Sequence, residues 1–229
     1  MPGQNQKYSL KIPYLTQAEV RRLDKKAKRF LPELLLIENA SRGASRVILS
    51  RFKFKTCVVV AGKGNNGADA LASCRHLMNA GKKAKVFIAA ARSDVNTQVK
   101  FELSVLQKVF RVTPVYLGSS ASLRKLKQAL KKTEVVIDGI FGINFHLPLH
   151  PFYRNIFEII NQAEARVVSL DIPSGLSADS REVDTAVKAD LTITFVTPKR
   201  TLLYPTTKSY WGEAVVVDIG IGYEFLKKL

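Results

Sequence analysis

Three aspartates, two neighbouring asparagines and a serine stand where this sequence could do chemistry. They are Asn65, Asn66 and Asp69 in GKGNNGAD, Asp138 in VIDG, and Asp171 and Ser174 in DIPSG. Each group follows or ends an apolar run, so each is expected at the end of a strand. Two strand-end aspartates facing one pocket could divide the work, one kept ionised by a bound cation and the other exchanging protons. The alternative is that both aspartates only cap the helices that follow.

The glycine-rich stretch at 62–67 predicts a strand, a tight turn and a helix. The first free N–H groups of such a helix favour phosphate or carboxylate. GKGNNG also has the G-x-G-x-x-G spelling of dinucleotide-binding folds, but the expected acid after the second strand is replaced by Ala89–Ala91 and Arg92. Asn65 and Asn66 could bind a ligand or a cation through their carbonyl oxygens, or could be turn residues with positive φ.

The elements that must position these residues alternate regularly. Continuous Val/Ile-rich strands separated by helices indicate a parallel sheet covered on both faces, an α/β, Rossmann-like fold in three αβα layers. The carboxyl ends of such strands share one rim, where ligands bind. The predicted strands are 57–61, 84–91, 112–117, 134–139, 166–171, 191–196 and 214–220, and the later helices are 96–110, 120–132 and 153–163.

The N-terminal part predicts two helices before the first strand. Residues 1–15 look irregular, and Thr16 with Glu19 forms a capping-box signature for the first helix. Pro32 opens the second helix, whose apolar residues should dock on the sheet; these are Leu35, Leu36, Ala40 and Ile48. We expect one domain over 1–229, in which a helical extension (1–52) packs on an α/β core (56–220).

The composition excludes several classes of protein. No apolar run approaches the roughly 18 residues of a membrane span, and the N-terminus lacks the apolar region of a signal peptide, which predicts a cytoplasmic protein. Cys57 and Cys74 are expected to be packing residues. His76, His146 and His150 are not placed for a Ser–His–Asp triad or a zinc site.

The net charge of +17 suggests attraction to polyanions or solvated helix faces. The basic runs carry few aromatic residues and no recognised nucleic-acid signature, so nucleic acid is not the expected partner. A basic rim around a site for an anionic small molecule fits equally well.

Taken together, the motifs resemble one known family. GKGNNGAD, VIDGIFG, SLDIPSGL, TFVTPKRTLLYP and YWGEAVVVDIGI, in this order, are similar to the YjeF N-terminal domain family, the NAD(P)H-hydrate epimerases. The resemblance implies interconversion of the R and S forms of hydrated NADH and NADPH (NADHX and NADPHX) at C6 of the nicotinamide, so that a separate dehydratase clears both. It also favours a homodimer.

The resemblance also implies the site residues. A potassium ion, one per subunit, would be held by Asn66, Asp138 and Ser174. The family usually has glycine at the positions of Ala68 and Ala70, so this chain departs from its pattern there. The residues implied to contact the hydrate are Asn65, Asn66, Gly67, Ala68, Asp69, Gly142, Ile143, Asn144, Phe145, His146, Leu147, Pro148 and Asp171.

The chemistry of the hydrate suggests a mechanism. The C6 hydroxyl leaves with help from the N1 lone pair, and water re-enters from the other face. This requires a group that protonates the hydroxyl and accepts a proton from water, and Asp171 is our hypothesis for it. Two alternatives stay open: a noncatalytic YjeF-like module that binds nucleotides or RNA, and an unrelated nucleotide-dependent enzyme.

Overall fold

A seven-stranded sheet forms the centre of the molecule, which we describe from a computed structural model covering residues 13–221, 225 and 228. The strand order is β3-β2-β1-β4-β5-β6-β7, and every neighbouring pair is parallel. This confirms the predicted α/β class. The strands are β1 (Thr56–Ala61), β2 (Lys83–Ile88), β3 (Val115–Tyr116), β4 (Val135–Gly139), β5 (Arg166–Leu170), β6 (Leu191–Phe195) and β7 (Glu213–Val217).

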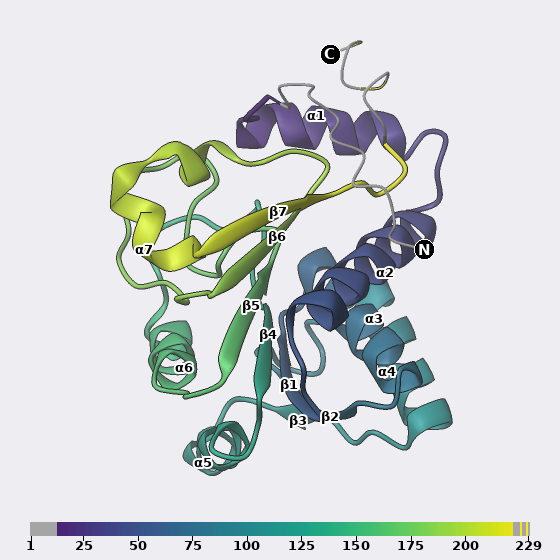
Figure 1. The fold of residues 1–229 in the computed structure, drawn as a ribbon, viewed down its shortest axis with the longest axis vertical. Coiled ribbons are helices and arrows are strands. Elements are labelled where there is room, and N and C mark those ends of the chain that lie inside the picture. The colour runs from purple at the N-terminus through teal and green to yellow at the C-terminus, as the bar shows by residue number, and fades with distance from the viewer. Residues whose placement is uncertain (1–12, 222–224, 226–227, 229) are drawn as a thin grey trace.

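Helices cover both faces of the sheet, as Figure 1 shows: α2, α3 and α4 lie on one side, and α5 and α6 on the other. Between β6 and β7 the chain adds a short helix, α7 (Lys208–Trp211), and two 3-10 turns that the sequence did not predict. The longer helices are α1 (Gln17–Ala27), α2 (Glu33–Arg51), α3 (Asn65–Asn79), α4 (Thr97–Phe110), α5 (Ser120–Leu130) and α6 (Pro151–Asn161).

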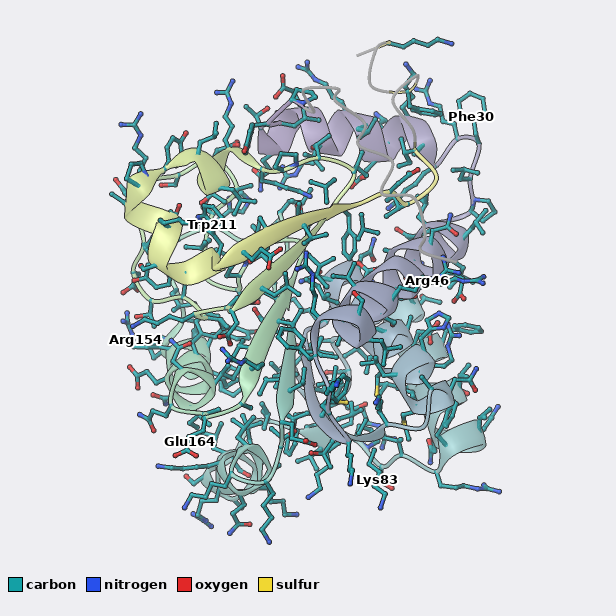
Figure 2. The ribbon with its side chains drawn as sticks, viewed as in Figure 1. Phe30, Arg46, Lys83, Arg154, Glu164 and Trp211 are labelled. Carbon is teal, nitrogen blue, oxygen red and sulfur yellow. The ribbon has the colours of Figure 1, made fainter. Side chains whose placement is uncertain are left out.

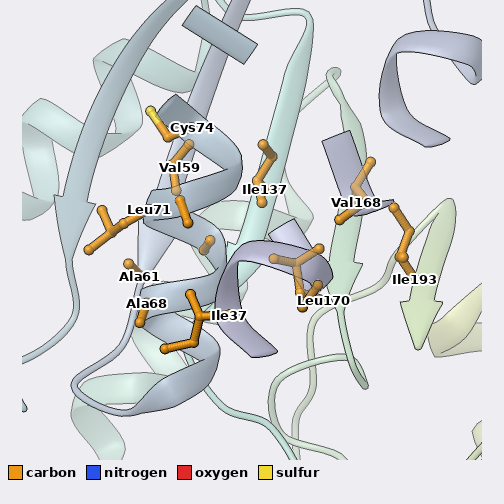
Figure 3. Packing of buried hydrophobic residues seen from close by; sticks show 14 of the residues in the cluster. Ile37, Val59, Ala61, Ala68, Leu71, Cys74, Ile137, Val168, Leu170 and Ile193 are labelled. Atoms are coloured by element: carbon orange, nitrogen blue, oxygen red, sulfur yellow. The ribbon is translucent and has the colours of Figure 1, made fainter. Parts of the chain in front are cut away.

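The core lies on both sides of the sheet because successive side chains of a strand point to opposite faces. In β1, Val59 and Ala61 pack with α2 and α3, where Ile37, Ala68 and Leu71 meet them (Figure 3). Val58 and Val60, which alternate with them along the strand, pack toward α5 and α6 instead. Burial on both faces explains why the strands read as continuous apolar runs.

The structure corrects several details of the predicted elements. The strand predicted at 112–117 is reduced to β3, the strand predicted at 84–91 ends at Ile88, and the strand predicted at 214–220 ends at Val217. Leu35 does not dock on the sheet, because 43% of its surface is exposed. Leu36, Ala40 and Ile48 are buried as expected.

The N-terminal helix α1 is fixed to the loop that follows β6. Thr16 and Glu19 form the predicted capping box. Leu15 bridges to Lys199: the amide of Leu15 donates to the carbonyl of Pro198 at 3.0 Å, and the amide of Arg200 donates to the carbonyl of Leu15 at 3.2 Å. The helix therefore has a defined place over the sheet. Most of the predicted irregular arm, residues 1–12, lies outside the described residues.

Many charged side chains lie on the outside of the molecule. In Figure 2 the labelled Arg46, Lys83, Arg154 and Glu164 all point away from the sheet. Among the helices in the described part of the chain, none has the length and apolar character needed to cross a membrane.

Candidate active site

A cavity of about 680 Å³ opens at the carboxyl ends of the strands. Its walls come from α1, the start of α2, the glycine-rich motif, the loop after β4 and the segments that follow β5 and β6. This is the rim at which doubly wound sheets bind ligands. The polar residues that line it include Asp24, Lys28, Glu33, Lys63, Asn65, Asn66, Asp69, Asn144, Asp171 and Lys199.

The helix α3 begins inside the glycine-rich motif, at Asn65, with Gly64 as its N-cap. Neither Asn65 nor Asn66 has a positive φ, so the interpretation of the doubled asparagine as a strained turn is wrong. Gly67 lies so close to the preceding loop that a Cβ there would meet the carbonyl oxygen of Gly62 at 2.1 Å. The sequence therefore needs glycine at 67 to bring the helix onto the strand end.

The two asparagines hold the motif to different parts of the protein. The Asn65 side chain donates to Glu33 at 2.8 Å and accepts from Asn96 at 2.9 Å, which ties α3 to the starts of α2 and α4. The Asn66 amide donates to the carbonyls of Phe141 (2.6 Å) and Leu170 (3.1 Å). It thereby joins the ends of β4 and β5.

Asp171 follows β5 directly and has a φ of 68°, a left-handed conformation that few non-glycine residues adopt. Its carboxylate pairs with Lys199, whose side chain is only 1% exposed. The Lys199 ammonium also donates to Thr194 Oγ1 and to the carbonyl of Phe195, both at 2.9 Å. A strained backbone held by a buried ion pair is typical of a functional position.

Asp138 does not share the cavity wall with Asp171, which corrects the expectation of two aspartates facing one pocket. Its side chain is fully buried beneath the cavity and accepts hydrogen bonds from Ser169 Oγ (2.8 Å), Ser174 Oγ (2.6 Å) and the amides of Ser174 (2.9 Å) and Ile140 (3.2 Å). Burial raises its pKa above the usual range, despite the bonds from Ser174 and Ser169. Asp138 is thus suited to anchoring rather than to contact with substrate.

Acidic groups near the cavity have altered proton affinities. Burial, followed by the negative charges of Asp171 and Asp24, raises the pKa of Asp69 well above its usual range. Burial and the charge of Asp171 raise the pKa of Asp24 to about 6. Burial also acts to raise the pKa of Glu33, but hydrogen bonds from Lys28 and Asn65 lower it overall.

Most of the predicted contact residues line the cavity. Three do not: Gly67 and Ala68 are buried in α3, and Leu147 packs against the core cluster on the α5 and α6 side of the sheet. The contact of these residues with a ligand stays a prediction. Those on the wall are Asn65, Asn66, Asp69, Gly142, Ile143, Asn144, Phe145, His146, Pro148 and Asp171.

Two residues of the wall, Lys199 and Asp24, were missed by the sequence analysis. Lys199 comes four residues after β6, so the rule of polar residues after strand ends would have found it. Asp24 stands four residues after Val20 and four before Lys28, and all three line the cavity from one face of α1. That spacing was the available signal.

The predicted potassium ligands lie close together. Phe141 links two of them, because its carbonyl accepts from Asn66 and its amide donates to Ser174 Oγ at 2.9 Å. Asn66 Oδ1 is buried and has no hydrogen-bond partner within the described part of the chain. An amide oxygen, a hydroxyl and a carboxylate are hard oxygen donors, so this set fits a cation that prefers oxygen ligands.

Comparison with known proteins gives a match over most of the chain. The family described as YjeF-related protein N-terminus matches residues 33–201. The chain belongs to this family. The glycine-rich motif, Asp138 and Asp171 all fall within the YjeF-related region.

Individual relatives of this YjeF-related chain match more of its length than the family region does. It is 30% identical to an NAD(P)H-hydrate epimerase of Rhodopirellula baltica over 96% of this chain and 89% of that protein. It is 34% identical to a bifunctional NAD(P)H-hydrate repair enzyme of Moorella thermoacetica over 90% of this chain, but spans only 40% of that longer protein. A crystal structure of the yeast protein ynu0 shares the fold, with a TM-score of 0.80, 23% identity and coverage of 95% and 93% of the two chains.

Proposed function

We propose that this protein epimerises hydrated NADH and NADPH at C6 of the nicotinamide ring. The observation that carries the proposal is Asp171, a residue with a left-handed backbone whose carboxylate lies at the cavity wall and is paired with a buried lysine. Relatives that match this chain over nearly their whole length are named NAD(P)H-hydrate epimerases, so the noncatalytic alternative is not favoured. We retain a separate dehydratase, a homodimer and a cytoplasmic location as part of the proposal.

The cavity offers an apolar wall for the nicotinamide ring. Phe141 stacks on Phe145 with ring centroids 5.1 Å apart, and its ring centroid lies 4.6 Å from that of Tyr153. A second cavity of about 570 Å³ adjoins the first and shares Lys63, His150 and Tyr153 with it. We place the rest of the dinucleotide there, with its phosphates near Lys63 and the N-terminus of α3.

In the proposed reaction Asp171 works at the C6 carbon. Loss of the hydroxyl leaves a cationic iminium, which a nearby carboxylate stabilises. Asp171 accepts the proton of the water that adds to the iminium, and Lys199 keeps the carboxylate in one orientation. The enzyme therefore needs to hold the nicotinamide ring and the Asp171 carboxylate in a fixed position relative to each other.

Asn66, Asp138 and Ser174 are the residues we propose to hold potassium. A bound potassium ion would supply positive charge beside the buried Asp138. The protein's own part is to fix the loop after β4 through Asn66 and Ser174, both of which bond to Phe141. That loop carries Gly142–Pro148 to the cavity.

One assay tests the proposal. Purified R-NADPH hydrate is incubated with the protein and a dehydratase that consumes only the S form, and NADPH formation is followed. We expect wild-type protein to accelerate conversion and Asp171→Asn to lose at least a hundredfold in rate. Without the dehydratase, epimerisation in H₂¹⁸O should place the label in the C6 hydroxyl of the S hydrate. Failure of folded wild-type protein to convert the hydrate would overturn the proposal.

A further inference from the structure

Helix α1 places a second carboxylate in the cavity. Val20, Asp24 and Lys28 line it from one face of the helix, while Leu23 and Ala27 on the adjoining face are buried. The capping box and the bridge from Leu15 to Lys199 fix the start of the helix. Asp24 is therefore held at the cavity by a rigid element other than the sheet edge that carries Asp171.

Two other acids of this wall are engaged by the protein, whereas the Asp24 carboxylate has no hydrogen-bond donor in the described part of the chain. Asp171 is paired with Lys199, and Glu33 accepts from Lys28 and Asn65. Within the described residues, no group donates a hydrogen bond to the side chain of Asp24. Partly buried carboxyl groups normally find a partner, so an unengaged one lining a ligand cavity points to the ligand itself.

Charges from several elements act on Asp24. Asp171 after β5, Glu33 at the start of α2 and Asp69 on α3 are acidic, whereas Lys199 after β6 and Lys28 on α1 are basic. Burial has the largest effect, and the balance raises the pKa of Asp24 to about 6. A group of this kind exists in both protonation states near neutral pH, as a proton-transfer group requires.

Inversion at C6 requires protons on two faces of the ring. The hydroxyl leaves one face and must be protonated there, whereas water adds from the other face and must lose a proton there. Resting on the function proposed above, we infer that Asp24 is the second proton-transfer residue of the epimerase, acting from α1 while Asp171 acts from the end of β5.

The proton and electron balance closes without a further reagent. Protonated Asp24 gives its proton to the C6 hydroxyl as the C–O bond breaks, water departs, and the N1 lone pair forms the C6=N1 double bond. A water molecule then adds to C6 from the other face. A lone pair of the water oxygen forms the new C–O bond, the π electrons of the C6=N1 bond return to N1 as its lone pair, and ionised Asp171 accepts the water proton. The reverse direction runs from the resulting state, with Asp171 protonated and Asp24 ionised.

This two-residue scheme predicts a specific pH profile. Both directions begin from the pair carrying one proton, so kcat/KM should fall about tenfold per pH unit once the pH exceeds the pKa of Asp24, and it should do so for both epimers. Replacement of Asp24 by asparagine removes that group. For the epimer whose conversion begins with protonated Asp24, the high-pH decline should then vanish, and at least a hundredfold of the wild-type rate should be lost.

The experiment compares wild-type protein, Asp24→Asn, Asp24→Ala and Lys25→Ala in the coupled hydrate assay between pH 5 and 9. Lys25 is an exposed residue of α1, so its variant controls for changes to the helix and should match wild type. Added formate should raise the rate of Asp24→Ala at least tenfold, because it can take the place of the missing carboxyl group.

The outcomes separate this inference from the function on which it rests. If wild-type protein does not convert the hydrate, the function fails. If wild-type protein is active while Asp24→Asn stays within threefold of it, or slows but keeps the high-pH decline for both epimers, the role of Asp24 is wrong. If the variants do not fold, a wild-type kcat/KM that stays flat between pH 5 and 8 overturns the inference.

Discussion

Lys199, whose side chain is only 1% exposed, donates a hydrogen bond to the Asp171 carboxylate. The same ammonium donates to Thr194 Oγ1 and the Phe195 carbonyl, so all three of its donors are used. Residues from two neighbouring strand ends are thereby held together. The carboxylate has one stable orientation toward the cavity.

Replacement of Lys199 by methionine should cost both stability and activity. It leaves Asp171 as an uncompensated, largely buried charge, which typically destabilises a protein by about 3–5 kcal/mol. We expect that loss in urea unfolding and at least a hundredfold loss of kcat. Lys188→Met, at an exposed position, is the control. Wild-type kcat in folded Lys199→Met would show that the lysine does not position Asp171.

Gly142 lies close to two residues of the candidate site, Asp171 and Asn66. A Cβ there would lie 3.3 Å from Asp171 Oδ2 and 3.4 Å from Asn66 Cβ. Gly142→Ala should displace both side chains and lower kcat/KM by at least tenfold, with a loss of roughly 1 kcal/mol in stability. Gly118→Ala, whose methyl group meets nothing within 4 Å, is the control for stability. An unchanged kcat/KM would contradict the tight fit.

Ala68 replaces a glycine that is usual in the family, yet the structure gives it an ordinary place. It is fully buried within α3 and does not have a positive φ. Ala68→Gly should therefore lower the unfolding free energy by about 1 kcal/mol, because glycine is a poor helix residue, and should not raise kcat. Chemical denaturation and the hydrate assay measure the two effects. A gain in kcat would mean that the alanine restricts the site.

Asp24 should make folding depend on pH. Its pKa is raised to about 6 in the folded protein from 3.8, so its stabilising effect is complete below pH 4 and is lost as the pH rises through 6. Asp24→Asn should therefore be more stable than wild type by roughly 1–2 kcal/mol at pH 8, with the advantage disappearing near pH 4. Urea unfolding at both pH values tests this, and an equal difference at both would contradict it.

Potassium binding can be tested through stability alone. An ion that binds only the folded state stabilises it by mass action, and about 1 kcal/mol moves Tm by about 2–4 °C in a domain of this size. We expect Tm to rise in potassium relative to choline, and Asn66→Ala to lose the rise. Asn65→Ala should keep it, since its side chain bonds to Glu33 and Asn96 instead. Equal Tm values in both salts would exclude the site.

The sequence predicted the sheet well because its strands are buried on both faces, which leaves unbroken Val/Ile runs. It overestimated β3 for a physical reason: Pro114 has no N–H to donate, so pairing begins only at Val115. Leu35 was assigned to the wrong face of α2. The buried residues recur every four positions from Leu36 through Ala40 to Ile48, and Leu35 lies one position off that stripe.

The candidate site was predicted in part for similar reasons. Asn66 and Asp171 follow strands and so had to reach the shared rim. Asp138 also ends a strand, but its hydrogen bonds to Ser174 draw it beneath the cavity, and no sequence pattern reports such a bond. Asp24 lies on a helix whose position over the sheet depends on tertiary contacts with Lys199 and its neighbours.

The attachment of α1 to the rest of the protein also limits how far the chain can be truncated. Gln17 donates to the Ile143 carbonyl and Arg21 Nε donates to Asn144 Oδ1 at 3.0 Å, so the helix is hydrogen-bonded to the loop after β4. The matched family region, 33–201, stops short of both this helix and β7. An expression fragment trimmed to those limits would lack Asp24, one wall of the cavity and an edge of the sheet. Expression fragments should therefore begin before Leu15 and end after β7.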